Sequence, residues 1–230
     1  MTILKQTLLF LCVFTITIAV SQEEIKEKDI SQVNISDLIK EVQIIKKDGD
    51  NFKMVWWIPN EYWRVAIQGT SVASSGYVDQ VFDAFEGYIL IGTLHTEINA
   101  FGGMKPKPTK IQLKDKKGNI YDAVDENELP SEYSKMLATL KPSMASTMGD
   151  FGKQMKFHVF KETGKNGKLI ASATGTGEFT VLFNKENKFT YKLPLACLVE
   201  EKVCPTDGEL LNANWIFCPW HGKKLKLQTK

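Results

Sequence analysis

A short repeat near the end of the chain constrains its folding more than any other feature. Cys204-Pro205-Thr206-Asp207-Gly208 is followed, 14 residues later, by Cys218-Pro219-Trp220-His221-Gly222. Each copy reads Cys-Pro-x-[Asp or His]-Gly, so the first and fourth positions carry side chains that can ligate a metal. The glycine permits the positive φ that a tight turn needs. The repeat therefore predicts two turns that direct four ligands to one ion: Cys204, Asp207, Cys218 and His221.

The two copies resemble the knuckles of zinc ribbons and rubredoxin-like proteins, in which a Cys-Pro-x-Cys-Gly turn directs two ligands. The resemblance covers residues 204–222 and implies a structural zinc site, since four protein ligands leave no open position for a substrate. Both copies depart from the family pattern at the fourth position. His221 is a ligand that zinc accepts readily, whereas Asp207 is uncommon in closed structural sites.

The first 21 residues predict export. Lys5 precedes an apolar run at 8–20, and Ala19-Val20-Ser21 places small residues before Gln22. This pattern is typical of a signal peptide that is cleaved after Ser21. The run of about 13 residues is shorter than the roughly 20 that a membrane-spanning helix needs. We therefore expect a mature chain of residues 22–230 in a periplasm or outside the cell, with no transmembrane segment.

The cysteines leave two questions open: which residue is the fourth ligand, and whether a metal or a disulfide joins them. Cys12 lies inside the predicted signal peptide, so the mature chain keeps three cysteines, and Cys197 is the rival of Asp207 for the fourth ligand position. An exported chain meets an oxidising compartment, so a disulfide is the alternative to a metal, with Cys197–Cys204 and Cys204–Cys218 as candidate pairs. The paired turns and His221 favour the metal. Two sulfurs with nitrogen and oxygen favour zinc over iron.

The charge of the chain argues against a nucleic-acid partner. The sequence has 29 basic and 27 acidic residues, a formal net charge of +2, and Arg64 is the only arginine. Arginine is the side chain that contacts guanine edges and phosphates in a bidentate manner. A chain with one arginine and almost no net charge is a poor candidate for specific nucleic-acid binding.

The body of the chain, residues 51–193, predicts an α+β domain. Apolar spacings of three and four residues predict helices that begin near Tyr77 and Ser131. Alternating or continuous apolar residues predict a hairpin at 111–121 and strands at 52–58, 88–94, 155–159, 179–183 and 189–193. We expect a mixed, mainly antiparallel sheet with two to three helices. A charged lead at 22–50 precedes this domain, and the zinc-ribbon-like segment 194–230 follows it. A pure sandwich is the second choice, because helices interrupt the strands.

Three of the five tryptophans gather at the start of the body, at positions 56, 57 and 63. Adjacent residues of a strand point to opposite faces, so Trp56 and Trp57 must diverge. The functional hypothesis is an aromatic platform for a carbohydrate or peptide, formed by Trp56, Trp57 and Trp63. The competing interpretation is packing on both faces of the sheet. The segment is also similar to uncharacterised secreted bacterial proteins, which implies location and no activity.

Two further candidates involve histidines. His95 and Glu97 lie two residues apart on one strand and so share a face, as a general base and its orienting carboxylate could. No Gly-x-Ser-x-Gly nucleophile motif accompanies them, and a solvated strand end is the competing interpretation. His158 is out of phase with the apolar residues Phe157 and Val159, so we expect it on the solvated face of its strand.

Together these features favour an exported, non-enzymatic binding or interaction protein of bacterial type with a structural zinc site. Its partner would be a protein, a peptide or a carbohydrate. Two alternatives stay open. The first is a secreted hydrolase that uses His95 and Glu97, and the second is a metal-handling or redox protein that uses the cysteine cluster.

Overall fold

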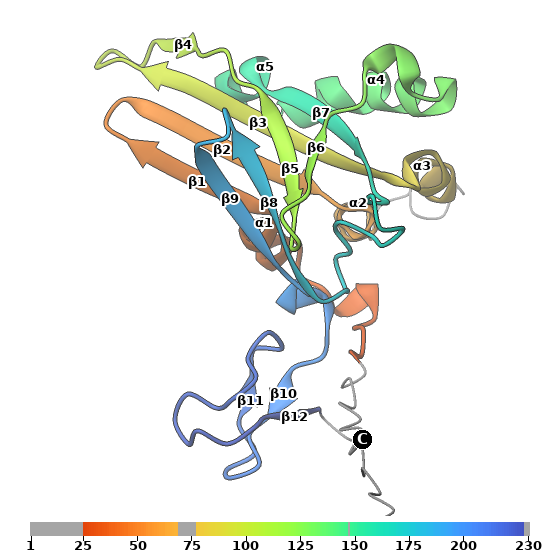
Figure 1. The fold of residues 1–230 in the computed structure, drawn as a ribbon, viewed down its shortest axis with the longest axis vertical. Helices are drawn as coiled ribbons and strands as arrows, with labels where there is room; N and C mark the ends of the chain where they lie inside the picture. Colours follow the sequence, from red (N-terminus) through yellow and green to blue (C-terminus); the bar gives the residue numbers. More distant parts are fainter. Residues whose placement is uncertain (1–24, 69–76, 147, 228–230) are drawn as a thin grey trace, which may run out of the picture.

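Two antiparallel sheets pack face to face in the body of the molecule, and helices cover the outer face of the first sheet (Figure 1). The structure, a computed structural model, describes residues 25–68, 77–146 and 148–227. The predicted signal peptide lies outside the described residues. Mixed helices and antiparallel sheets confirm the α+β class. Among the described residues, no helix is long and apolar enough to cross a membrane.

β3 (Tyr88–Ile98) is the central strand of the first sheet. Every residue from 89 to 94 is buried, as expected of a continuous apolar run that is covered on both faces. One edge of β3 pairs with β2, which pairs with β1, and its other edge pairs with β7 and then with β4. The bounds of these strands are β1 (Gln43–Asp48), β2 (Asn51–Ile58), β4 (Met104–Pro106) and β7 (Lys156–Lys161).

The second sheet is held against the first by aromatic side chains. Trp57 of β2 makes edge-to-face contacts with Phe179 and Tyr191, at ring-centroid distances of 4.9 and 5.6 Å. The hydroxyl of Tyr191 donates to the backbone carbonyls of Val42 and Val55, 3.1 and 3.3 Å away. The strands of this sheet are, in order, β6 (Ile120–Asp122), β5 (Ile111–Asp115), β8 (Gly177–Phe183) and β9 (Asn187–Leu193).

The helices cover the opposite face of the first sheet, where Trp56 lies. Trp56 contacts Tyr62 of α2 at 5.3 Å, and Trp63 stacks on Phe85 of α3, which in turn contacts Tyr133 of α4. The helices are α1 (Ile35–Val42), α2 (Asn60–Ala66), α3 (Tyr77–Phe85), α4 (Ser131–Ser146) and α5 (Asp150–Gln154), with short 3-10 turns η1 (Ile30–Gln32), η2 (Glu126–Glu128) and η3 (Ala196–Leu198). α4 continues through Pro142.

The body is longer at both ends than the predicted range 51–193. β1 lies within the predicted lead and pairs with β2 from Gln43 to Asp48. At the other end, Leu195, Leu198 and Val199 are buried, the first two of them in the core of the body. Backbone hydrogen bonds join Lys28 to Leu198 and Glu200 to Lys26, so the two ends of the body close on each other.

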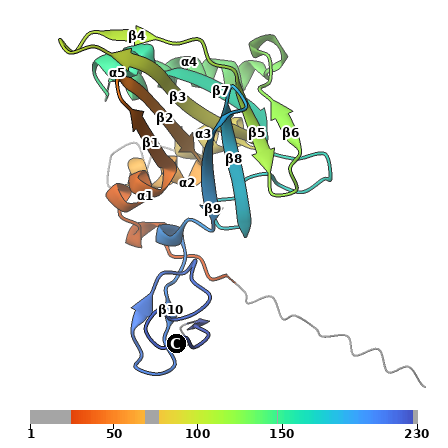
Figure 2. The same cartoon turned by 60° about the vertical axis from the view of Figure 1, so that its left-hand side comes forward.

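The C-terminal module, residues 200–227, lies at one end of the body (Figures 1 and 2). Its sheet consists of three two-residue strands in the order β11 (Leu210–Leu211), β10 (Lys202–Val203), β12 (Lys226–Leu227). Its buried cluster is small: Cys204, Leu211, Cys218 and Leu225. A cavity of about 300 Å³ lies between module and body, lined by Pro194 on one side and Ile216 on the other.

Removing the side chain that joins the two sheets should destabilise the body. Trp57 is 2% exposed, so Trp57→Ala leaves a large cavity, and we expect a loss of about 3–5 kcal/mol in the free energy of unfolding. Urea unfolding followed by circular dichroism measures this change. Phe101→Ala is the matched control, because Phe101 is 98% exposed, and it should change stability by less than about 0.5 kcal/mol. Equal effects of the two substitutions would contradict this packing.

Candidate metal centre

The two predicted turns have the same backbone geometry. The N–H of Cys204 donates to the carbonyl of Glu209, and the N–H of Gly208 donates back to Cys204, both at 2.9 Å. The second turn has the same two hydrogen bonds between equivalent positions. The N–H of Cys218 donates to the carbonyl of Lys223 at 2.8 Å, and the N–H of Gly222 donates to the carbonyl of Cys218 at 2.9 Å. Gly208 and Gly222 have φ of +79° and +61°, which is the region that favours glycine.

Backbone N–H groups within each turn point at its sulfur. Cys218 Sγ accepts from Trp220 and His221, and Cys204 Sγ accepts from Thr206 and Asp207, so the donors stand at equivalent positions. Desolvation opposes ionisation of both thiols. At Cys218 these N–H groups, together with the side chains of His221 and Cys204, outweigh desolvation and lower the thiol pKa, whereas at Cys204 desolvation prevails and raises it. Each turn is therefore a preformed cradle for a sulfur ligand.

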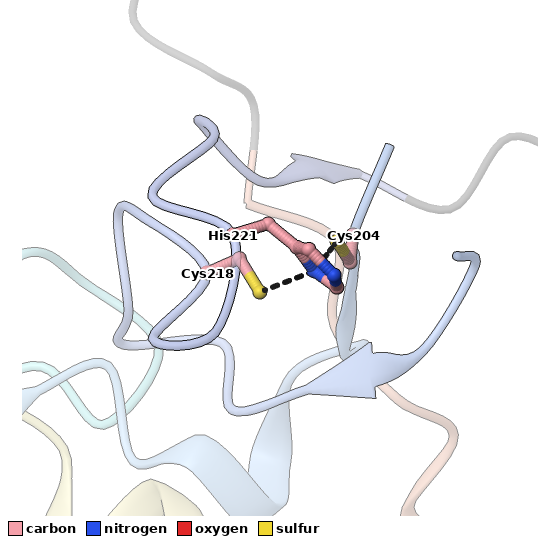
Figure 3. A group of neighbouring side chains, drawn as sticks. All are labelled: Cys204, Cys218 and His221. Carbon is pink, nitrogen blue, oxygen red and sulfur yellow. Dashed lines mark hydrogen bonds between the residues drawn. The ribbon is translucent and has the colours of Figure 1, made fainter. Parts of the chain in front are cut away.

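Three ligand atoms meet where the turns face each other (Figure 3). His221 Nδ1 lies 3.4 Å from Cys204 Sγ and 3.5 Å from Cys218 Sγ, and the three atoms all lie within 4.8 Å of one another. A tetrahedral zinc with ordinary Zn–S and Zn–N bonds would place S and N about 3.6 Å apart. Cys204, Cys218 and His221 thus form a group that could hold a metal ion.

Asp207 stands beside this group. One of its carboxylate oxygens lies 3.7 Å from His221 Nδ1, and the other accepts the backbone N–H of Glu209 at 3.1 Å. The N–H of Glu209, followed by hydrogen bonding to Cys204, lowers the pKa of the Asp207 carboxyl. The structure therefore brings three of the four predicted ligands together, and the ionised Asp207 carboxylate lies beside His221 but is not part of the group.

Cys197, the rival ligand, belongs to the body. Its backbone N–H donates to Glu41 Oε1 at 2.9 Å, and its side chain packs against the main core. Burial, followed by the charge of Glu41, raises the pKa of the Cys197 thiol to about 12. It is not part of the Cys204, Cys218 and His221 group, and the three described cysteines form no disulfide.

The three tryptophans of the proposed aromatic platform are buried. Trp56, Trp57 and Trp63 are 3%, 2% and 8% exposed, and all three belong to the main core. Trp56 and Trp57 do point to opposite faces, as adjacent strand residues must, but helices cover one face and the second sheet covers the other. The platform hypothesis is therefore wrong, because none of the three rings is accessible to a ligand, and the competing interpretation of packing on both faces of the sheet is confirmed.

His95 and Glu97 have separate partners. His95 Nδ1 lies 2.6 Å from the hydroxyl of Thr109, which also donates to the carbonyl of Lys107 at 3.1 Å. Glu97 forms an ion pair with Lys107 at 3.0 Å. Desolvation, followed by the charges of Lys53 and Lys107, lowers the His95 pKa. The carboxylate of Glu97 is thus held by a lysine, and the arrangement lends no support to a base with its orienting acid.

His158 is partly buried, whereas the sequence predicts a position on the solvated face. It pairs with Ile91 on the face that the second sheet covers, and its Nε2 lies 2.9 Å from Thr93 Oγ1. Desolvation, followed by the charges of Lys156 and Lys141, lowers its pKa to about 4. The alternation predicts the correct phase of this strand, but it does not reveal how far the face that carries His158 is covered.

This partly buried histidine should make stability depend on pH. Because the His158 pKa falls from 6.5 to about 4 on folding, the unfolded chain binds an extra proton between these values. Stability therefore decreases as the pH falls from 6.5 to 4, by about 3 kcal/mol from this group. We expect His158→Gln to remove this dependence. Urea unfolding of both chains at several pH values measures it, and parallel curves would contradict the assignment.

Comparisons with known proteins do not assign the chain to a family. No family model and no curated protein matches it. Among solved structures, the chain is similar to a DUF4426 family protein from Pseudomonas aeruginosa PAO1, with 13% sequence identity and a TM-score of 0.27. The similarity covers 66% of this chain and 91% of that chain. A likeness of this size carries no argument about function, which therefore has to be inferred from the site.

Proposed function

We propose that the chain is an exported, non-enzymatic binding protein whose C-terminal module is folded around a structural zinc ion. The ion is bound by Cys204, Cys218 and His221, with the carboxylate of Asp207 as the fourth ligand. The observation that carries the proposal is the pair of equivalent turns, each with a glycine at positive φ and two N–H groups on its sulfur. In the folded module, these turns hold the two sulfur ligands in position.

The small size of the module supports a structural role for the ion. Its cluster of buried residues has four members, two of which are the cysteines. A segment of this length cannot bury enough apolar surface to offset its conformational entropy. Metal binding supplies the missing free energy in such modules, because the site exists only in the folded state.

The donor set supports zinc and a closed site. Two thiolates, an imidazole and a carboxylate satisfy the four-coordinate preference of Zn²⁺ without strain from d-electrons. With all four positions filled by protein, the ion has no place for a substrate, which fits a module that presents a surface. Export is part of the proposal and is supported by the pattern of residues 1–21.

Elemental analysis of the purified chain tests the metal. We expect one zinc per chain in the wild type and none in Cys204→Ser or Cys218→Ser, because each removes a thiolate ligand. Cys197→Ser is the matched control, since Cys197 lies in the body, and it should keep the zinc. The module should then become sensitive to proteolysis in the two metal-free variants only. A wild type without zinc, or equal losses in all three variants, would overturn the proposal.

A second substitution tests the fourth ligand. Asp207→Asn keeps the shape of the side chain but removes the charge, so we expect about 10–100-fold weaker zinc binding in competition with a chelator. Glu209→Gln removes an exposed carboxylate two residues away and should leave the affinity unchanged. If both variants bind zinc like the wild type, water fills the fourth position. The site would then be open, as the metal-handling alternative requires.

A further inference from the structure

A cavity of about 300 Å³ lies in the body beside α2, α3 and the segment that enters η1. Its described lining carries two acids and two bases: Glu27, Glu61, Lys28 and Arg64. Three apolar side chains form another part of the wall: Ile30, Phe82 and Leu198. Small-molecule pockets have volumes of roughly 300–1,000 Å³, so a cavity at the lower end of this range fits a small ligand.

The opposite charges of Glu61 and Arg64 do not pair with each other. The two residues lie three positions apart on α2, so their side chains share one face of the helix. The guanidinium of Arg64 lies instead over the ring of Phe82, 4.3 Å from its centroid. Among the residues that the structure describes, neither side chain has an ion-pair partner. An unpaired carboxylate and an unpaired guanidinium thus line the same cavity.

The protein compensates the charge of Glu61 only in part. Glu61 is partly buried, and desolvation raises the pKa of its carboxyl against the smaller opposing effects of its own backbone N–H and Arg64. The charge of Glu27 raises this pKa further. On its other side Glu61 shares a small cavity with Glu162, whose pKa is raised by desolvation and then by the charge of Glu61. A cationic group of a ligand beside Glu61 would relieve this repulsion.

The segment that enters η1 adds one further charge of each sign, Glu27 and Lys28. The N–H of Lys28 donates to the carbonyl of Leu198 at 2.9 Å, and Glu27 bridges to Val199, so this wall of the cavity is fixed by backbone contacts. With two acids and two bases, the lining has no net charge. This balance argues against a purely anionic or purely cationic ligand and favours one that carries both charges.

We propose that this cavity binds an α-amino acid with an apolar side chain. Such a molecule carries its ammonium and carboxylate on one carbon, which matches two opposite charges on one helix face. The ammonium binds the Glu61 carboxylate, and the carboxylate binds the guanidinium of Arg64, whose edge stays free to donate while its face stacks on a ring. The apolar side chain lies against Ile30 and Leu198. The site belongs to the body, so the proposal goes beyond the proposed function and does not depend on zinc.

Calorimetric titration of the purified full chain with leucine tests the proposal. N-acetyl-leucine lacks the ammonium charge and leucine amide lacks the carboxylate, so we expect each to bind at least tenfold more weakly than leucine. Glycine keeps both charges but lacks the apolar side chain, and it should also bind at least tenfold more weakly. A wild type that does not bind leucine at millimolar concentrations, or that binds the three analogues as well as leucine, would overturn the proposal.

Two substitutions assign the charges within the cavity. Glu61→Gln should weaken leucine binding at least tenfold and leave the weak binding of N-acetyl-leucine unchanged, because that analogue has no ammonium group. Arg64→Gln should weaken both of these ligands and leave leucine amide unchanged. Glu178→Gln is the matched control, since Glu178 is an exposed residue of β8 outside this cavity, and it should bind leucine like the wild type.

Equal losses in Glu61→Gln and Glu178→Gln would rule out the assigned site. The comparison of leucine with its analogues uses the wild type alone, so it stays decisive if a variant misfolds. Zinc content is measured on the same samples. A chain that binds leucine but holds no zinc contradicts the proposed function alone, and a zinc-loaded chain that ignores leucine contradicts this inference alone.

Discussion

Two hydrogen-bonded turns that face each other determine the structure of the C-terminal module. Each turn fixes a cysteine through a glycine at positive φ and through N–H groups on the sulfur, so the sulfurs and Nδ1 of His221 come together. Hydrophobic burial alone is too weak to hold a module with so small a core. Under the proposed function, an ion bound where these ligands converge takes the place that a hydrophobic core has in a larger domain.

The body, by contrast, is held together by side chains packed between its layers. Its central strand β3 is covered on both faces, by the helices on one side and by the second sheet on the other. Trp57 and Tyr191 lock the two sheets together, and the aromatic residues of α2, α3 and α4 form a second packed layer. Most large aromatic side chains of the body are buried by packing, whereas those of the module are exposed, because the module has little core to accept them.

The sequence predicted those features that depend on local chemistry. The apolar run that becomes β3, the hairpin of β5 and β6 and the paired Cys-Pro turns are all encoded within a few residues. The prediction failed where distant segments decide the outcome. β1 was not predicted, because it is an edge strand. Its exposed Lys46 and Lys47 weaken the alternation of apolar and polar residues that marks a strand. For Trp56 and Trp57 the sequence left a platform and packing on both faces open, and for His158 it predicted too much exposure, because the pattern of one strand cannot reveal what covers it.

The backbone bonds between Lys26 or Lys28 and residues 198–200 have a consequence for assembly. They join positions that are more than 170 residues apart, and an ion pair between Lys26 and Glu200 at 2.7 Å reinforces them. Contacts of such large sequence separation form only after the intervening chain has collapsed, because the entropy of closing the loop must be overcome first. The two turns, by contrast, are local. The module can therefore bring its three ligand atoms together before the body is complete, but its orientation on the body is fixed only at the last stage of folding.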